Sequence, residues 1–519
     1  SELIDLGRLS KKEVRLSPIK VKRMGKRPNA NLQPIAPVVE DPPPEAIAAA
    51  LAEALCRLAH LDPQLSAAKP AGRLFATLLV MSSCWALMAL FLRLDTKVLA
   101  WIVLSLASGT SLFRLWACCL PRQTASPEPP AGLREQEPVW TILVALYHEA
   151  GSVPSLLEAL GKLDWPKEKL DLVFACEADD HETLAALATW RPYYRFRIIV
   201  VPKGGPRTKP KALQTALPFC RGRYLTIYDA EDLPSPCQIR EAWHAFQKGP
   251  ANLAVVQAPL VIWNEQESWI SRQFALDYAI WFRLILPALV RLSRFLPLGG
   301  TSNHFDIHYL RAAGGWDPYN VTEDADLGAR LARFGLMATL IPSPTYEEGA
   351  PTFKGWVRQR GRWIQGHIQT VSVHLRAAPN FPRQLGGCGL LAFFLGLGSG
   401  PLNAAVMLLS SLVALGQAVN GEWGGALVWA GAMGLSQTVV GMIAVLRDGR
   451  SSLWIACLAI PLYQLCQVPA LCRAIWRVYL SPSIWDKTNH GAEARPHGSS
   501  FAKHQHAVGE PQTWIGQQL

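Results

Sequence analysis

Three short motifs hold residue types that could act together in one reaction. Asp229-Ala-Glu-Asp232 follows a run of strand-forming residues and supplies carboxylate oxygens, the ligands that Mg²⁺ and Mn²⁺ prefer. Thr322-Glu-Asp324 begins a helical run and offers Asp324 as a candidate general base, although Thr322 or Asp324 could simply cap that helix. Gln359-Arg-Gly-Arg-Trp363 joins a guanidinium fork that suits phosphate to an indole face that suits stacking. The set indicates transfer of a group from a phosphate-bearing donor to an acceptor hydroxyl.

Strand-forming and helical stretches alternate around the first of these motifs. We expect strands at 139–146, 171–176, 196–201, 223–228 and 253–258, with helices between them at 152–162, 181–190, 209–218 and 236–247. This alternation predicts an α/β domain with a mostly parallel sheet, in which ligands bind at the carboxyl ends of the strands. The acid motif lies at such an end, directly after the fourth strand.

Other polar residues follow the first two predicted strands. Tyr147 and Glu149 come after the first strand, and Glu177 comes after the second. Two aspartates close to Glu177, Asp179 and Asp180, offer a different role, because either could cap the helix that begins at His181.

Two lysines open the third of the predicted helices. Lys209 and Lys211 follow the pair Gly204-Gly205. A lysine at a helix start beside a glycine-rich loop suits a diphosphate, because the amide groups of a helix N-terminus favour anions. Either lysine could instead be an ordinary surface charge.

The motifs, in this order and between hydrophobic segments, resemble those of the processive family-2 glycosyltransferases. That group contains the cellulose, hyaluronan and poly-N-acetylglucosamine synthases, and the resemblance covers about residues 135–380. It implies a cytoplasmic GT-A (Rossmann-like) domain, a UDP-sugar donor, bound Mg²⁺ or Mn²⁺, and a growing polysaccharide as acceptor. The family's metal motif is Asp-x-Asp. Asp229 matches its first residue, and Glu231 stands where the second aspartate is usual, so Glu231 and Asp232 both stay open as further ligands.

The resemblance also assigns roles to single residues. Asp324 becomes the base that takes the proton from the acceptor hydroxyl as this oxygen attacks the anomeric carbon, which inverts the anomeric centre. The acceptor side consists of Thr322, Glu323 and Trp363. The UDP-sugar side consists of Tyr147, Glu149, Glu177, Lys209, Lys211, Asp229, Gln359 and Arg362.

The composition fits a chain that is part membrane protein and part soluble domain. Among 519 residues, 50% are hydrophobic and 18% are charged, which is too apolar for an ordinary soluble enzyme and too polar for a pure transporter. Much of the net charge of +11 lies in the first thirty residues. Such a basic segment favours the cytoplasmic side and anionic lipid, or is simply a solvated tail. No aromatic residues alternate with these charges, which argues against nucleic acid as a partner.

Hydropathy divides the chain into segments. We expect a basic segment with a short helix (1–70), a transmembrane hairpin (71–120), the catalytic domain (135–350), an interfacial helix (351–385), three or four C-terminal spans (386–480) and a cytoplasmic tail (481–519). The stretch 268–296 is apolar but carries four arginines, which favours an amphipathic interfacial helix over a span. Five or six spans remain open, because 452–480 could be one kinked or re-entrant element.

Three readings of the function follow. The first is a processive synthase in a bacterial inner membrane that uses UDP-glucose or UDP-N-acetylglucosamine and works with periplasmic or outer-membrane export partners. The second is a non-processive membrane transferase that adds one sugar to a lipid or short glycan. The third is a transporter or an inactive scaffold. A transporter is disfavoured because the apolar runs 74–92, 401–418 and 423–446 carry no charged residue that could relay ions. An inactive scaffold is disfavoured because Asp229, Asp324 and Arg362 are all present.

Overall fold

A computed structural model describes residues 39–69, 71–91, 97–122, 137–293, 295–376, 380–419, 421 and 424–480. The basic segment up to residue 38, residues 123–136 and the predicted tail 481–519 lie outside the described residues.

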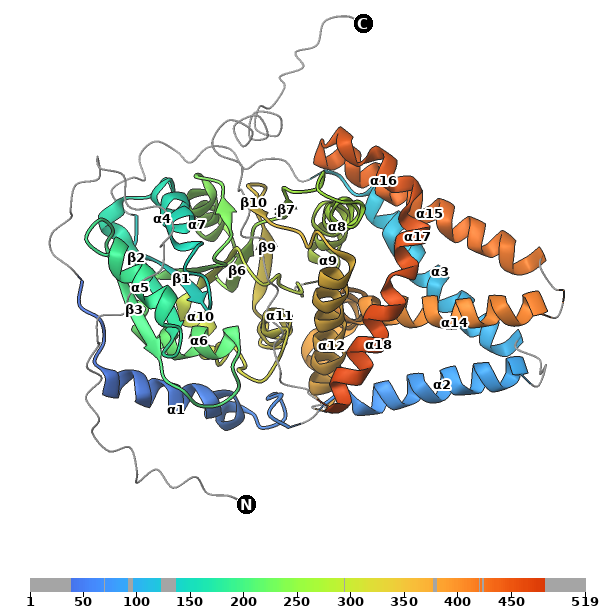
Figure 1. Ribbon diagram of the computed structural model, residues 1–519, viewed down its shortest axis with the longest axis horizontal. Coiled ribbons are helices and arrows are strands. Elements are labelled where there is room, and N and C mark those ends of the chain that lie inside the picture. The colour runs from blue at the N-terminus through green and yellow to red at the C-terminus, as the bar shows by residue number, and fades with distance from the viewer. Residues whose placement is uncertain are drawn as a thin grey trace, which may run out of the picture.

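A seven-stranded sheet forms the centre of the α/β part (Figure 1). Its order is β3-β2-β1-β4-β8-β6-β9. The strands are β1 (Trp140–Leu146), β2 (Leu170–Glu177), β3 (Phe196–Val201), β4 (Tyr224–Tyr228), β6 (Leu253–Gln257), β8 (Asn303–Asp306) and β9 (Met337–Leu340). Five of them confirm the predicted strands. β8 pairs antiparallel with β4 and β6, and the other pairs are parallel.

Side chains of alternating strand positions feed two cores, one on each face of the sheet. Ile142 and Val144 pack with helices α4 (Val153–Gly161), α5 (His181–Trp190) and α7 (Gln238–Lys248). Leu143 packs on the other face with α6 (Lys209–Ala216). Helix α1 (Pro44–Leu61) corresponds to the short helix predicted within residues 1–70. It lies against α6 with Leu51 and Leu58 buried.

A small second sheet brings a distant acid to the end of β4. It consists of β5 (Leu233–Pro234), β10 (Thr345–Glu347) and β7 (Leu260–Ile262), in the order β5-β10-β7. β5 follows the acid motif directly, so its pairing with β10 places Glu347 beside that motif.

Long helices lie side by side, pointing away from the sheet (Figure 1). They include α2 (Arg73–Phe91), α3 (Lys97–Cys119), α14 (Ser399–Val419) and α15 (Gly424–Asp448), with α16 (Trp454–Leu458), α17 (Ile460–Leu465) and α18 (Gln467–Leu480) alongside. Within the described residues, two helices are long and apolar enough to cross a membrane, Trp269–Leu292 and Phe381–Gln417. Ser451–Leu458 and Ile460–Leu480 would make a third as one bent element, with an angle of 66°. The break in 452–480 agrees with the kinked alternative.

The stretch predicted as an interfacial helix at 268–296 forms one long helix. It comprises α8 (Trp269–Ile280), a π-helical turn η4 (Trp281–Ile285) and α9 (Leu286–Leu292). This helix has the length and composition of a membrane span, yet 72% of its most apolar 18-residue stretch is buried inside the protein. One of its arginines, Arg283, pairs with Asp448 at 2.9 Å, so its charge is compensated by the protein.

Candidate active site

A cavity of about 330 Å³ lies between the carboxyl ends of the strands and the long helices. Its lining includes residues of α11 (Glu323–Arg333), of α12 (Phe353–Arg376) and of the loop before β8. All of the site residues predicted from the sequence line this cavity, except Lys211 and Asp232. The motifs that begin at Asp229, Thr322 and Gln359 are therefore brought to one place.

The acid motif places its members differently. Asp229 and Glu231 line the cavity, whereas the Asp232 side chain turns into the protein and is 1% exposed. Asp232 accepts a hydrogen bond from the backbone N–H of Asp229 at 2.7 Å and another from Thr301 Oγ1. Asp232 therefore shapes the turn, and its predicted role as a metal ligand stays untested.

Lys209 lies at the centre of the donor end. Its ammonium pairs with the Asp229 carboxylate and donates to the carbonyl of Gly300 at 2.7 Å. Burial lowers the pKa of Lys209, but Asp229 and Glu323 raise it by more, so the net shift is upward and the side chain stays charged. A fixed cation beside a cavity carboxylate is suited to an anionic donor.

The carboxylates around the cavity fit a divalent metal. Glu347 lies near Asp229 and Glu231, and its pKa is raised to about 8 by burial and by these two neighbours. Within the described residues, no three of these acids bring their oxygens within 4.8 Å of one another. The acids alone would leave a metal under-coordinated, which agrees with the preference of Mg²⁺ for one or two carboxylates plus substrate phosphates.

The candidate base lies in the first turn of α11. Asp324 Oδ1 accepts a hydrogen bond from the backbone N–H of Ala325 at 2.7 Å. Burial raises the pKa of Asp324, and the cations Lys209 and Arg362 oppose the rise. Burial and the charge of Asp324 likewise raise the pKa of Glu323. Thr322 takes the N-cap position but makes no side-chain cap hydrogen bond, so the simple capping role considered for it is absent.

The glycine loop 298–301 passes directly over this base. A Cβ atom at position 300 would lie 3.4 Å from Asp324 Oδ2, so this part of the loop packs against the carboxylate. The adjacent Gly299 donates its N–H to Gln257 Oε1 at 3.1 Å, which fixes the loop to β6.

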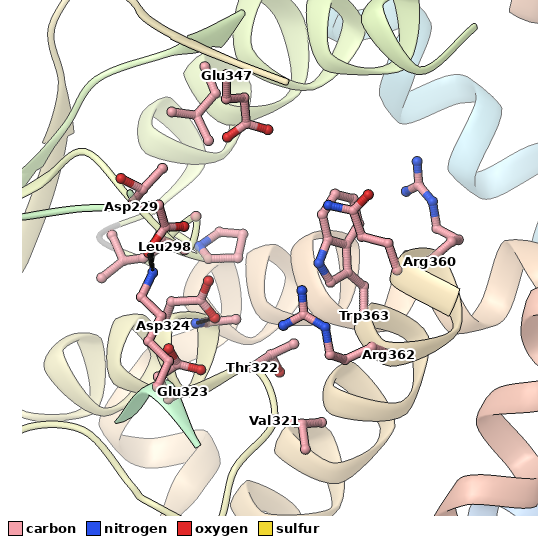
Figure 2. Close-up of a pocket in the computed structure, with 18 of the residues that line it drawn as sticks. Asp229, Leu298, Val321, Thr322, Glu323, Asp324, Glu347, Arg360, Arg362 and Trp363 are labelled. Carbon is pink, nitrogen blue, oxygen red and sulfur yellow. Dashed lines mark hydrogen bonds and ion pairs between the residues drawn. The ribbon is translucent and has the colours of Figure 1, made fainter. Parts of the chain in front are cut away.

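Helix α12 carries the aromatic and cationic motif into the cavity. Figure 2 shows Arg362 pointing towards Asp324, with Trp363 beside it. The Trp363 ring contacts Phe274 and Tyr278 of α8, with ring centroids 5.7 and 6.2 Å apart. Arg360, which is not among the predicted site residues, also lines the cavity, and its Cζ lies 4.9 Å from the centre of the Trp363 ring.

A further arginine that was not predicted as a site residue, Arg207, lies at the donor end. Arg207 donates to the Tyr147 hydroxyl at 2.9 Å and pairs with Asp179 at 2.7 Å. Asp180 caps α5 by accepting from the Thr183 N–H, which confirms the capping role considered for one of the two aspartates. Only proximity in space links Arg207 to Tyr147, since 60 positions separate them.

Glu177 and Lys211 form a buried ion pair. Their charged atoms are 2.9 Å apart, and the Lys211 side chain is 2% exposed. Glu177 reaches the cavity, but Lys211 lies behind it. Direct contact of Lys211 with a diphosphate stays a prediction, and its observed partner is a carboxylate.

The cavity continues from the acids into the helical part of the protein. Beyond Trp363 it is lined by Ser399 and Asn403 of α14, Gln464 of α17 and Gln467 of α18. Amide side chains can both donate and accept hydrogen bonds. This extension therefore has the polar character that a hydroxylated ligand requires.

Comparison with known proteins agrees with this site. Residues 224–466 match the family model described as Glycosyl transferase family group 2, a segment that contains all three motifs. Beta-monoglucosyldiacylglycerol synthase of Trichormus variabilis is 26% identical over 239 residues, which are 45% of this chain and 49% of the relative. Probable glucomannan 4-beta-mannosyltransferase 7 of Oryza sativa subsp. japonica is 24% identical over 252 residues, which are 46% of this chain and 43% of the relative. The chain spans about half of the length of the curated relatives it matches.

Among solved structures, mannosyltransferase PcManGT from Pyrobaculum calidifontis, in complex with GDP-Man and Mn²⁺, has the same fold. The superposition has a TM-score of 0.51 at 18% sequence identity. It covers 74% of this chain and 99% of the mannosyltransferase chain. The chain is therefore an enzyme with a glycosyltransferase family-2 domain within residues 224–466, and its α/β part has a GT-A fold.

Proposed function

We propose that the chain is an inverting membrane transferase that polymerises the sugar of UDP-glucose or UDP-N-acetylglucosamine into a β-linked polysaccharide. The observation that carries this proposal is the continuous cavity, which runs from Asp229 past Trp363 to the amides of Asn403, Gln464 and Gln467. Sugar hydroxyls would satisfy these amides, whereas an acyl chain would leave them buried without hydrogen bonds, which is costly. A glycan is the better occupant of this path.

The chemistry assigns each end of the cavity a task. The Asp324 carboxylate takes the proton of the acceptor hydroxyl while that oxygen forms its bond to the anomeric carbon and the bond to UDP breaks. Arg362 and Lys209 supply positive charge for the diphosphate that leaves. Asp229 and Glu231 would hold Mg²⁺ or Mn²⁺, and the ion would add further positive charge for the leaving group. Attack from the face opposite UDP turns an α-linked donor into a β-linked product.

The acceptor sugar belongs beside Trp363. Its indole offers an apolar face of the kind on which sugar rings stack, and Arg360 and the rings of α8 hold it in place. Within the described residues, Gln359 Oε1 is buried without a protein hydrogen-bond partner. A sugar hydroxyl at this position would satisfy that oxygen. Thr322 and Glu323 border the same space on the side of the base.

The long helices support a location in a bacterial inner membrane. In this proposal they cross it several times, the catalytic domain faces the cytoplasm and the polymer leaves between the helices. Periplasmic or outer-membrane partners would then receive it. The candidate spans Trp269–Leu292 and Phe381–Gln417 both border the cavity through their residues, which links the site to this route.

A second candidate function is the addition of one sugar to a lipid. The similarity to a diacylglycerol-modifying synthase favours it. The two functions share the donor end and differ in what occupies the helical end of the cavity.

The test is UDP release by the lipid-reconstituted protein with single UDP-sugars and Mg²⁺ or Mn²⁺, together with the size of the product. A long polymer that a β-glycanase digests supports the proposal. A product of one sugar on extracted lipid supports the second candidate. Absence of UDP release with every donor, when Asp324→Asn behaves identically, contradicts both.

A further inference from the structure

The second half of α12 contacts the segment that carries the base at four points. We call residues 319–326 the base segment. Gly366, Gln369, Thr370 and His374 all face it, at the spacing of one helix face. Gln369 and Thr370 are 2% and 0% exposed, so water does not compete for their hydrogen bonds. Arg362 lies one turn before Gly366 on the same helix.

Gln369 holds the backbone of the base segment on both sides of Asn320. Its Oε1 accepts from the N–H of Val321, and its Nε2 donates to the carbonyl of Tyr319, both at 3.3 Å. One amide therefore satisfies one donor and one acceptor of the backbone just before α11 begins. Few side chains besides glutamine and asparagine can do both.

Thr370 holds the side chain of Asn320, which in turn holds the entry to α11. Asn320 Nδ2 donates to Thr370 Oγ1 at 3.0 Å, and Asn320 Oδ1 accepts from the N–H of Thr322 at 3.1 Å. Two residues further along the chain is Asp324. Displacement of Asn320 would therefore displace the carboxylate relative to Arg362.

A buried ion pair fixes the other end of the base segment. His374 Nε2 lies 3.1 Å from Asp326 Oδ1, and Arg330 Nε donates to Asp326 Oδ2 at 2.8 Å. Both Asp326 and His374 are 0% exposed. Asp324 thus lies between two anchors, at Asn320 and at Asp326, and both anchors are made to α12.

We propose that Gln369 and Thr370 are positioning residues, which set the place of the Asp324 carboxylate relative to the Arg362 guanidinium of the same helix. This inference rests on the proposed function, because the assigned base is Asp324. Its chemical basis is that transfer needs the base and the phosphate-binding cation at a fixed separation, one on each side of the reacting sugar. A single helix that carries the cation and clasps the base segment supplies that separation.

The test compares Thr370→Val, which has nearly the same shape but no hydroxyl, with Thr370→Ser, which keeps the hydroxyl. Ser372→Ala is the matched control, since Ser372 bonds only to Ile368 of its own helix among the hydrogen bonds described. We expect Thr370→Val to lower kcat by on the order of 10- to 100-fold, with the donor KM within about twofold of wild type. Thr370→Ser and Ser372→Ala should retain most of the rate.

Hydrogen exchange of the protein without donor gives a second readout that does not depend on turnover. The amides of Val321 and Thr322 should exchange faster in Thr370→Val, and likewise in Gln369→Met, which has similar length and no amide. Unchanged exchange in both variants overturns the inference, as does wild-type kcat in Thr370→Val. If Thr370→Val does not fold, Gln369→Met carries the same comparison. If the wild-type protein turns over no UDP-sugar, the proposed function fails. Hydrogen exchange then still decides whether Gln369 and Thr370 hold the base segment in place.

Discussion

Gly366 of α12 lies directly against Thr322, the residue that precedes the first turn of α11. A Cβ atom at position 366 would come within 2.3 Å of Thr322 Cγ2 and 2.4 Å of Thr322 Oγ1. Real Cβ atoms do not approach other atoms so closely, so glycine is what allows this contact. The helix that carries Arg362 and Trp363 can therefore lie on the segment that carries Asp324.

Gly366→Ala should push the two segments apart. Overpacking of this kind costs about 1–3 kcal/mol, and a small displacement of the base slows transfer. We expect a lower unfolding temperature and a reduced rate of UDP release. Gly109→Ala in α3 is the control, because no heavy atom lies within 4 Å of its added Cβ. Equal behaviour of the two variants would show that the contact has no consequence.

The pH dependence of transfer should reflect the buried base. Burial raises the pKa of Asp324 above the usual aspartate value of about 3.9. As pH decreases, Asp324 should therefore take up its proton, and the rate should fall, at a higher pH than for an ordinary aspartate. Arg362 favours the ionised carboxylate, and Arg362→Gln should therefore raise this pKa further and move the acid limb of kcat to higher pH. The measurement is kcat against pH for both proteins at saturating donor. A limb that moves to lower pH would contradict the assignment.

Asp324→Asn should separate activity from stability. Loss of a general base costs on the order of 10²- to 10⁴-fold in rate. The pKa of Asp324 is higher in the folded than in the unfolded state, so the folded state binds this proton more tightly. Once pH rises above the unfolded pKa, ionisation of Asp324 therefore lowers the free energy of unfolding. The variant should thus lose transfer while its unfolding temperature at pH 7 stays level or rises. A fall in unfolding temperature together with the rate would point to a structural role.

Two acids of one motif should respond differently. Asp229→Asn should weaken Mn²⁺ binding in the presence of UDP, measured by the electron paramagnetic resonance of free Mn²⁺. It should also lower the unfolding temperature, because it removes the carboxylate that pairs with the largely buried Lys209 ammonium. Asp232→Ala leaves the Asp229 N–H without its acceptor and removes the closer of the two acceptors of the Thr301 hydroxyl, at a cost of about 1–3 kcal/mol. It should lower the unfolding temperature and leave Mn²⁺ binding unchanged. Weaker Mn²⁺ binding in Asp232→Ala than in Asp229→Asn would make Asp232 the metal ligand.

The sequence was sufficient for the parts of the fold that depend on local patterns. Each strand of the parallel half is an apolar run that ends in polar residues, so the position of Asp229 at a strand end could be predicted. The capping aspartate next to Glu177 was predictable in kind because capping depends on near neighbours. Helix α12 was predictable as a helix, and its motif was predictable as part of the site.

The remaining site residues depend on contacts between distant segments. Glu347 reaches the acids because β10 pairs with β5, and no local pattern encodes a pairing of such short strands. In the sequence nothing distinguishes Arg207 from other arginines, and only the fold places it beside Tyr147. The stretch 268–296 looked interfacial because of its arginines, and nothing near Arg283 in sequence indicates that Asp448 pairs with it.

Lys211 offers a test between a structural and a donor-binding lysine. If its role is the ion pair with Glu177, Lys211→Met strands a buried carboxylate, at a cost of about 3–5 kcal/mol. The double variant Glu177→Gln/Lys211→Met removes both charges and should recover most of that loss. Burial already raises the pKa of Glu177, and loss of the lysine should raise it further, so the single variant should suffer less at lower pH. If Lys211 instead contacts the diphosphate, the UDP affinity of folded Lys211→Met would fall, as we expect for Lys209→Met at the cavity wall. Unfolding temperatures and UDP affinities of these three variant proteins, compared with wild type, distinguish the two roles.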